Sequence, residues 1–323
     1  MNLFLPDSLF SRFEPTGRES VTLEFLGTAG FLVNAGDRAL VFDPYVSRPG
    51  LWRHRDRLRP NESLIRREII ERPGPLVREV FVGHAHSDHI LDAPFLCRET
   101  GARLIGSRSV CRTGRAAGVP EEQIVPVTRD RQVIACGEDA SVTAMHSRHA
   151  SISRDQKRLR RVNAITKAIV GRPVFETGED GSLSGVPFDG ETSDHLEWPA
   201  HVWELRCGQV FDWHVDIDGV SIVHIDSAEL RENQFRGLTA DIVCLCAIGR
   251  ENSEFDYTRK VLEELRPQVV IPCHWDFFFR DYRRRPRSWP GVHLASWLRE
   301  IEAIGKDRGI ETHLLRFGGV FGV

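Results

Sequence analysis

The sequence has no run of the roughly 18 apolar residues that a membrane-spanning helix requires. Its first seven residues also lack the basic start and the long apolar stretch of a secretory signal peptide. The seven cysteines are odd in number and follow no regular spacing, so they do not suit the framework of a disulfide-stapled secreted protein. These absences predict a protein of a reducing compartment, the cytoplasm.

Lysine is also scarce: only four positions carry it, so arginine clusters determine where positive charge lies. The formal net charge of -3 argues against the broad basic surface of a general nucleic-acid-binding protein. With 323 residues, of which 41% are hydrophobic, the chain is long enough to bury a substantial core. The composition is therefore that of an ordinary globular protein.

Short alternating or apolar runs bounded by Gly, Asp and Pro predict many strands. The first three, joined by glycine-containing turns, are expected at 21–25, 31–34 and 39–42. Further strands are expected at 80–83, 103–106, 124–127, 141–145, 202–206, 210–217, 220–225, 242–246, 268–272 and 312–316. Helical patterns fall near 90–100, 107–118, 256–266 and 293–304. This order indicates sheets covered by helices, an α/β or α+β class, and not a helical bundle.

Residues 150–200 differ from the rest of the chain. They include the basic stretch Lys157–Arg161, which begins a helical pattern that reaches about Val170, and then become rich in Gly, Asp and Pro. Long segments of this kind in compact enzymes often cover a site. We therefore expect a single domain over residues 1–323, with an insertion or mobile flap at about 150–200.

Four candidate metal ligands lie within six residues. Directly after the apolar run Glu79–Val82 come His84, His86, Asp88 and His89. Side chains on a tight loop after a strand can converge on one point, whereas a continuous helix or strand would separate them. Neutral imidazoles suit zinc, iron and related divalent ions, and a carboxylate adds an oxygen ligand. This spacing predicts a metal site.

Three further places offer ligands, and each comes just after an apolar run. They are His146 or His149, Asp226, and His274. Strand ends that meet at one edge of a sheet sandwich give a rigid frame for a metal site. The residues alone leave open which of the two histidines after residue 145 is the ligand.

The order of these residues resembles the metallo-β-lactamase superfamily: His-x-His-x-Asp-His, then a single His, then Asp, then His after an apolar strand. The segments Gly27–Leu32, Val41–Pro44 and Ile271–Trp275 are similar to the branch that holds ascorbate-6-phosphate lactonase and N-acyl-phosphatidylethanolamine phospholipase D. The resemblance spans roughly residues 20–317. It implies a four-layer αββα sandwich with the site at one edge.

The resemblance also implies a set of ligands for two divalent ions. The first ion would be held by His84, His86 and His149, and the second by Asp88, His89 and His274. Asp226 would bridge the ions, and His146 would then contact a ligand or the substrate. Zinc is the default metal for such a site, while manganese or iron would fit the same ligands.

Two neighbouring ions would share a water and give a bridging hydroxide that attacks a carbonyl carbon or a phosphorus. Asp226 would fix the spacing of the ions, and Asp88 would orient the hydroxide or move its proton. Asp43, at a strand end, is a candidate to accept a hydrogen bond from a metal-bound histidine. Arg283 would bind an anionic substrate if the arginine-rich segment 279–285 folds over the site, and would otherwise lie on a solvated surface.

These features favour a metal-dependent hydrolase that cleaves an ester, a lactone or a phosphodiester in a small substrate. Two alternatives stay open. Nucleases of the same superfamily share the His–Asp signature, although the acidic net charge argues against one here. A non-catalytic metal-binding scaffold is the other, although retention of every ligand position argues against it.

Overall fold

The computed structural model describes residues 5–11, 13, 16–17 and 19–323. The predicted absence of a signal peptide rests on residues 1–7, of which residues 1–4 lie outside the described part. Among the described residues, no helix is both long enough and apolar enough to cross a bilayer. All seven cysteines are buried and free.

The first sheet combines an antiparallel half with a parallel half. Within the described chain its seven strands are ordered β14-β1-β2-β3-β4-β5-β6. They are β1 (Val21–Gly27), β2 (Gly30–Ala35), β3 (Arg38–Phe42), β4 (Leu76–Val82), β5 (Arg103–Gly106), β6 (Ile124–Pro126) and β14 (Gly319–Gly322). Because β3 to β6 run parallel, their carboxyl ends lie at one edge of the sheet.

The second sheet is built in the same way. Its seven strands in the described residues are ordered β13-β12-β11-β10-β9-β8-β7. They are β7 (Gln132–Ala135), β8 (Ala140–Ser147), β9 (Val210–Ile217), β10 (Val220–His224), β11 (Ile242–Cys246), β12 (Val269–Cys273) and β13 (Glu311–Thr312). β10 to β12 run parallel, and β9 lies antiparallel to both β8 and β10, so β8, β10 and β12 share one direction.

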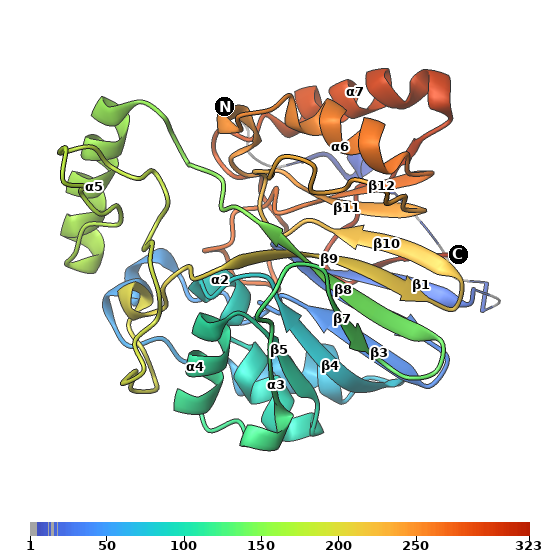
Figure 1. The fold of residues 1–323 in the computed structure, drawn as a ribbon, viewed down its shortest axis with the longest axis horizontal. Helices are drawn as coiled ribbons and strands as arrows, with labels where there is room; N and C mark the ends of the chain where they lie inside the picture. Colours follow the sequence, from blue (N-terminus) through green and yellow to red (C-terminus); the bar gives the residue numbers. More distant parts are fainter. Residues whose placement is uncertain (1–4, 12, 14–15, 18) are drawn as a thin grey trace.

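The two sheets face each other and helices cover their outer faces (Figure 1). α3 (Ala93–Thr100) and α4 (Arg108–Ala116) pack on the first sheet, while α6 (Tyr257–Leu265) and α7 (Leu294–Gly305) lie over the second. Between the sheets, the Phe81 ring lies 5.0 Å from the Phe42 ring and 5.1 Å from the Trp213 ring of the opposite sheet. Burial of such rings holds the sheets together. The predicted four-layer αββα sandwich is confirmed.

Two strand predictions are wrong. Residues 202–206 do not form a strand, because the His201 N–H donates to the Glu204 side chain at 2.7 Å and stabilises a 3-10 helix at Val202–Glu204. The strand expected over 312–316 stops at Thr312, and β14 instead pairs with β1.

Three further helices differ in length and position. α1 (Glu62–Ile65) and α2 (Ser87–Ile90) are single turns, whereas α5 (Gln156–Val170) is a longer helix that lies at one end of the molecule, away from the sheets (Figure 1). Its Asp155 N-cap accepts a hydrogen bond from the Lys157 N–H at 2.9 Å, and Gly171 ends it in the left-handed conformation.

Candidate metal centre

The predicted ligands follow strands of both sheets at one edge of the sandwich. His84 lies two residues beyond the end of β4, and His149 lies two residues beyond the end of β8. Asp226 follows β10, and His274 follows β12. Since these strands end at the same edge, side chains that are 185 positions apart, those of His89 and His274, come into contact there.

The rings of His84 and His86 direct ring nitrogens at each other. His84 Nδ1 donates to Asp226 Oδ2 at 2.5 Å, which leaves a lone pair on its Nε2. His86 Nε2 donates to the Pro187 carbonyl oxygen at 2.6 Å, which leaves a lone pair on its Nδ1. These two lone-pair nitrogens lie only 2.8 Å apart. Two acceptors at this distance repel each other unless a proton or a metal ion lies between them.

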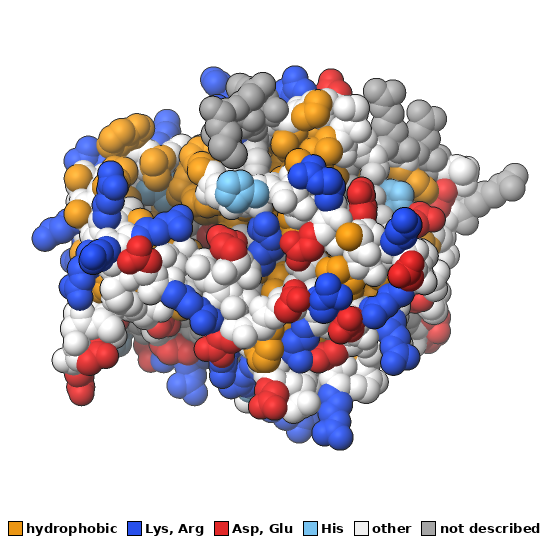
Figure 2. Space-filling view, turned by 90° about the horizontal axis from the view of Figure 1, so that it is seen from above, with side chains coloured by type: hydrophobic (Ala, Val, Ile, Leu, Met, Phe, Trp, Pro, Cys, Tyr) orange, Lys and Arg blue, Asp and Glu red, His pale blue; other side chains and the backbone are white. Residues whose placement is uncertain are grey.

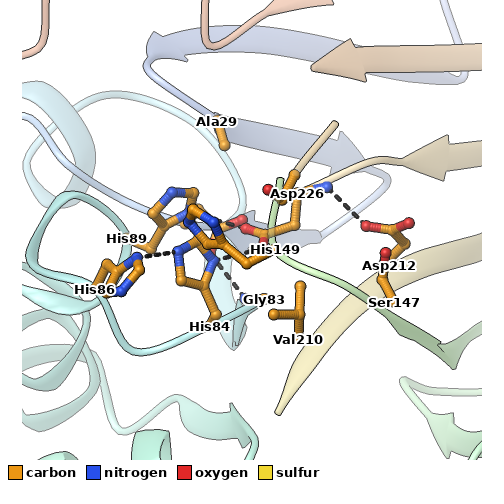
Figure 3. A network of polar contacts seen from close by, with 12 residues as sticks. Ala29, Gly83, His84, His86, His89, Ser147, His149, Val210, Asp212 and Asp226 are labelled. Atoms are coloured by element: carbon orange, nitrogen blue, oxygen red, sulfur yellow. Dashed lines mark hydrogen bonds and ion pairs between the residues drawn. The ribbon is translucent and has the colours of Figure 1, made fainter. Parts of the chain in front are cut away.

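His149 completes this first group, and Figure 3 shows the gathered rings on one side of Asp226. Its Nδ1 donates to the Ala150 carbonyl oxygen at 2.8 Å, so its Nε2 is also free to act as a ligand. Its ring centre lies 4.9 Å from that of His84 and 4.8 Å from that of His86. The three side chains each bring a ligand atom within 4.8 Å of the others.

A second group joins α2 to the end of β12. Nε2 of His89 lies 3.3 Å from Nε2 of His274. Oδ2 of Asp88 lies 3.5 Å from the His274 nitrogen and 3.7 Å from the His89 nitrogen. On its other side, His89 Nδ1 lies 2.9 Å from Asp226 Oδ1. Asp226 therefore contacts both groups, through Oδ2 to His84 and through Oδ1 to His89.

The residues present fit metal ions. Two buried polar atoms of the centre have no hydrogen-bond partner, Asp43 Oδ2 and His274 Nδ1. Burial lowers the pKa of His89, but the carboxylates of Asp226, Asp88 and Asp43 outweigh this and raise it well above its ordinary value. The surroundings thus favour positive charge. Unpaired buried acceptors and clustered carboxylates are costly in an empty interior and favourable around cations.

The ionisation of the other ligands also suits this role. Burial, together with the neighbouring imidazoles, lowers the pKa of His84 and of His86 well below the ordinary value. Burial alone would raise the pKa of Asp226 and of Asp88, but the adjacent His89 holds both below their ordinary value. Neutral imidazoles and ionised carboxylates are the forms that bind metal.

The position of Asp226 is fixed from two sides. Its N–H donates to Asp212 Oδ1 at 2.9 Å (Figure 3). The Gln234 amide donates to the other Asp212 oxygen. A Cβ added at Gly83 would lie 2.2 Å from Asp226 Cγ, so only glycine leaves room for the carboxylate. Asp212 carries no signal in the sequence, because it lies mid-strand in β9 and not after a strand.

Asp43, the predicted partner of a metal-bound histidine, lies at the end of β3 beside His89. Its Oδ1 accepts a hydrogen bond from the Gly83 N–H at 2.9 Å and lies 3.5 Å from His89 Nδ1. His224, in contrast, donates from Nε2 to the Ala29 carbonyl oxygen at 2.7 Å and is not part of either group.

A buried ion pair supports the loop that carries His274. Arg48 Nη1 donates to Asp276 Oδ2 at 2.7 Å, and both side chains are 0% exposed. The other Asp276 oxygen accepts from the Thr28 N–H, and the Thr28 carbonyl oxygen accepts from the His274 N–H. The sequence gives no sign of this pair, because 228 positions separate its members.

The backbone around the centre is strained. Four non-glycine residues adopt positive φ angles there: Thr28 (58°), Asp43 (42°), Arg48 (42°) and His274 (50°). Each such conformation costs about 1–3 kcal/mol and persists only where the surroundings impose it. Their concentration beside the His and Asp side chains is typical of a functional site.

Two predicted site residues lie elsewhere. The His146 N–H donates to Asp130 at 2.8 Å, and its Nδ1 accepts from Arg231 Nη1 at 3.1 Å, so its ring is engaged outside the cluster. Arg283 pairs with Asp281 at 2.7 Å, and its side chain is 61% exposed. The arginine-rich segment therefore does not bring Arg283 to the metal centre.

The placement of the two histidines gives a direct test. We expect His149→Ala to lose one metal ion per molecule, because it removes one of three facing nitrogen donors. His146→Ala should keep the full metal content, since its ring contacts Arg231 and not the cluster. Metal content measured by mass spectrometry on the two purified variants checks this. Metal loss from the His146 variant alone would reverse the assignment.

The centre opens into one end of a cavity of about 430 Å³, which Asp88, His149 and His274 help to line. This volume falls within the range of sites for small molecules.

Comparison with known proteins places these features in a family context. A family described as the beta-lactamase superfamily domain matches residues 22–274. A curated UPF0173 metal-dependent hydrolase of Anaeromyxobacter sp. (strain K) is 33% identical over 144 residues, which cover 44% of this chain and 46% of that protein. The chain thus spans about half the length of the curated relatives it matches.

Solved structures share the whole architecture. Igni18, a metallo hydrolase of Ignicoccus hospitalis, is 14% identical with a TM-score of 0.56, over 94% of this chain and 98% of that chain. The metallo-beta-lactamase fold protein YhfI of Bacillus subtilis is 12% identical with a TM-score of 0.52, over 94% and 99%. At these identities the likeness establishes the fold alone.

Proposed function

The chain belongs to the family described as the beta-lactamase superfamily domain, and from this we propose its function. We propose that it is a metal-dependent hydrolase that cleaves an ester, a lactone or a phosphodiester. One observation carries the proposal. Nitrogen and carboxylate ligands from both sheets converge in three groups within 4.8 Å, with two imidazole lone pairs facing each other. On a polar surface that binds no ion, the hydrogen-bond acceptors of neighbouring side chains would not point at one another.

We assign the ligands of two divalent ions, with zinc as the metal and manganese or iron as alternatives. His84, His86 and His149 would hold one, and Asp88, His89 and His274 the other. The support for Asp226 as the shared ligand is that each of its oxygens faces a different group. When bound, the ions would supply an activated water and a Lewis acid for the oxygen of the scissile group.

Asp88 is the carboxylate that we assign to proton transfer. Its side chain is 14% exposed, whereas that of Asp226 is 0% exposed, and Asp88 lines the cavity beside His274. An oxygen in that position can accept the proton of the attacking water and return it to the leaving group. Asp226 instead has both oxygens directed at imidazoles and serves as a fixed negative charge.

Metal removal and a substrate panel test the proposal. The panel holds p-nitrophenyl esters, small lactones, bis(p-nitrophenyl) phosphate and a single-stranded RNA; lactones and phosphodiesters are included because of the sequence resemblance described above. We expect turnover of at least one small substrate, its loss after chelation, and its return with zinc, manganese or iron. Full metal occupancy without turnover would favour a non-catalytic metal-binding scaffold. Cleavage of the RNA and of none of the small substrates would favour a nuclease.

A further inference from the structure

The cavity next to the metal centre has a strongly apolar body. Outside the His–Asp cluster, its charged lining residues in the described chain are Arg158 and Glu251, which carry opposite signs. The arginines at 283–285 are exposed and are not part of the lining. The cavity therefore offers no concentrated positive charge for a large anionic group, and its apolar walls determine what it can hold.

One wall is aromatic and begins at the metal centre itself. The Phe278 ring contacts the His274 ring edge-on, with 5.7 Å between ring centres. It stacks on Trp289 at 4.6 Å with an angle of 6° between the ring planes. Phe279 continues the wall and contacts the His54 ring at 4.9 Å. A substrate group bound at His274 would thus lie directly against aromatic faces.

Another wall of the cavity is one face of α5. Leu159, Val162, Thr166 and Val170 line the cavity, and their spacing of three or four residues places them on a single helix face. Val162 and Thr166 are only half-buried, so the protein itself does not cover this face fully. The opposite face carries exposed residues, among them Arg161 and Ala164.

The outer surface of this end of the molecule carries both charged and hydrophobic side chains. Figure 2 shows Lys and Arg side chains around hydrophobic ones at the left end, where Figure 1 places α5. The helix is held in place by its own contacts: Asn163 Oδ1 accepts from the N–H groups of Val174 and Phe175, and Leu159 packs on Phe175 and Leu183. These contacts tie α5 to the segment that follows it, up to Leu183.

We infer that the substrate is amphiphilic, with an apolar chain or ring next to its scissile bond that fills the space between α5 and the Phe278–Trp289 wall. This inference rests on the proposed function, because it takes the metal centre as the place where the bond is cleaved. Only an apolar group would gain binding free energy against these apolar faces, because each methylene that it buries contributes to affinity. A charged group placed there would lose its hydration without compensation. α5 thereby selects the substrate.

Binding of n-alkanols to the metal-loaded protein tests this without turnover. The series runs from butanol to decanol and displaces the fluorescent probe N-phenyl-1-naphthylamine. We expect the affinity to rise about fourfold per added methylene, which corresponds to ~0.8 kcal/mol, until the chain fills the cavity. Absence of saturable probe binding, or an affinity independent of chain length, would overturn the inference.

Two variants on the same helix locate the site. Val162→Asp places a charge on the cavity face and should weaken octanol binding at least about tenfold, since a carboxylate would be buried against the chain. Ala164→Asp makes the same addition on the exposed face and should leave binding unchanged. If the Val162 variant does not fold by circular dichroism, Thr166→Glu replaces it. Equal binding by cavity-face and control variants would contradict the assignment of α5.

The outcome is separable from that of the proposed function. Alkanol binding that is graded by length and lost in Val162→Asp supports an apolar substrate pocket even if the hydrolysis panel contains no substrate. Turnover of short esters with no alkanol binding would leave the hydrolase proposal standing and reject the amphiphilic substrate.

Discussion

Replacement of Asp226 with alanine should abolish turnover and strip metal from both groups of ligands. Asp226 is 0% exposed and contacts His84 through one oxygen and His89 through the other, at 2.5 and 2.9 Å. Its removal leaves two buried imidazoles without the carboxylate that orients them. Asp212 cannot move in as a substitute, because it is held by the Asp226 N–H and by Gln234.

We expect metal affinity to fall by more than about 100-fold in this variant, since even residues that only contact a metal ligand cost 10–100-fold. Metal titration and the substrate panel measure the two effects. Asp216→Ala is the matched control: it removes a carboxylate that is 57% exposed from the neighbouring strand β9 and should change neither. An Asp226 variant with full metal content and normal turnover would show that the centre is misassigned.

Arg48→Met should cause the largest loss of stability. It leaves the Asp276 carboxylate buried and without its counter-ion, and a buried pair broken on one side costs about 3–5 kcal/mol. Because Asp276 also accepts the Thr28 N–H, and Thr28 in turn binds the His274 backbone, metal affinity should fall together with the free energy of unfolding.

Urea denaturation of the metal-free protein isolates the stability effect. Arg259→Met is the control, since Arg259 is 52% exposed and its contacts with Asp256 and Glu263 are surface ion pairs worth about 0–1 kcal/mol. If Arg48→Met lowers the free energy of unfolding by no more than Arg259→Met does, the Arg48–Asp276 pair is not what stabilises the loop that carries His274.

Sheets covered by helices could be predicted from the sequence because the strands carry strong local signals, whereas the four-layer αββα arrangement was implied by the family resemblance. Apolar runs such as Val80–Val82 and Val269–Cys273 are buried in the structure, and their ends coincide with the predicted ligands. The 202–206 segment shows the limit of this reasoning: an apolar start was outweighed by the capping contact between His201 and Glu204. The local hydrophobic pattern does not show whether a capping hydrogen bond or a short apolar run will decide the conformation of a segment.

The supporting residues had no comparable signal. Asp212 lies inside a strand, and Arg48 and Asp276 are 228 positions apart. The positive φ angles of Thr28, Asp43 and His274 occur in residue types that do not require them. Such features arise only when distant segments pack and impose a conformation that a residue would not adopt alone.

The sequence by itself determined which side chains can bind metal and that strands would present them in order along the chain, because hydrophobic periodicity and ligand chemistry are local properties. The tertiary structure places His149 and not His146 in the cluster, as the family resemblance implied, and it alone shows that Arg283 stays in solvent and that α5 lines an apolar cavity beside the cluster. These outcomes depend on which strand ends and helix faces meet in space, and that is set by the packing of the two sheets.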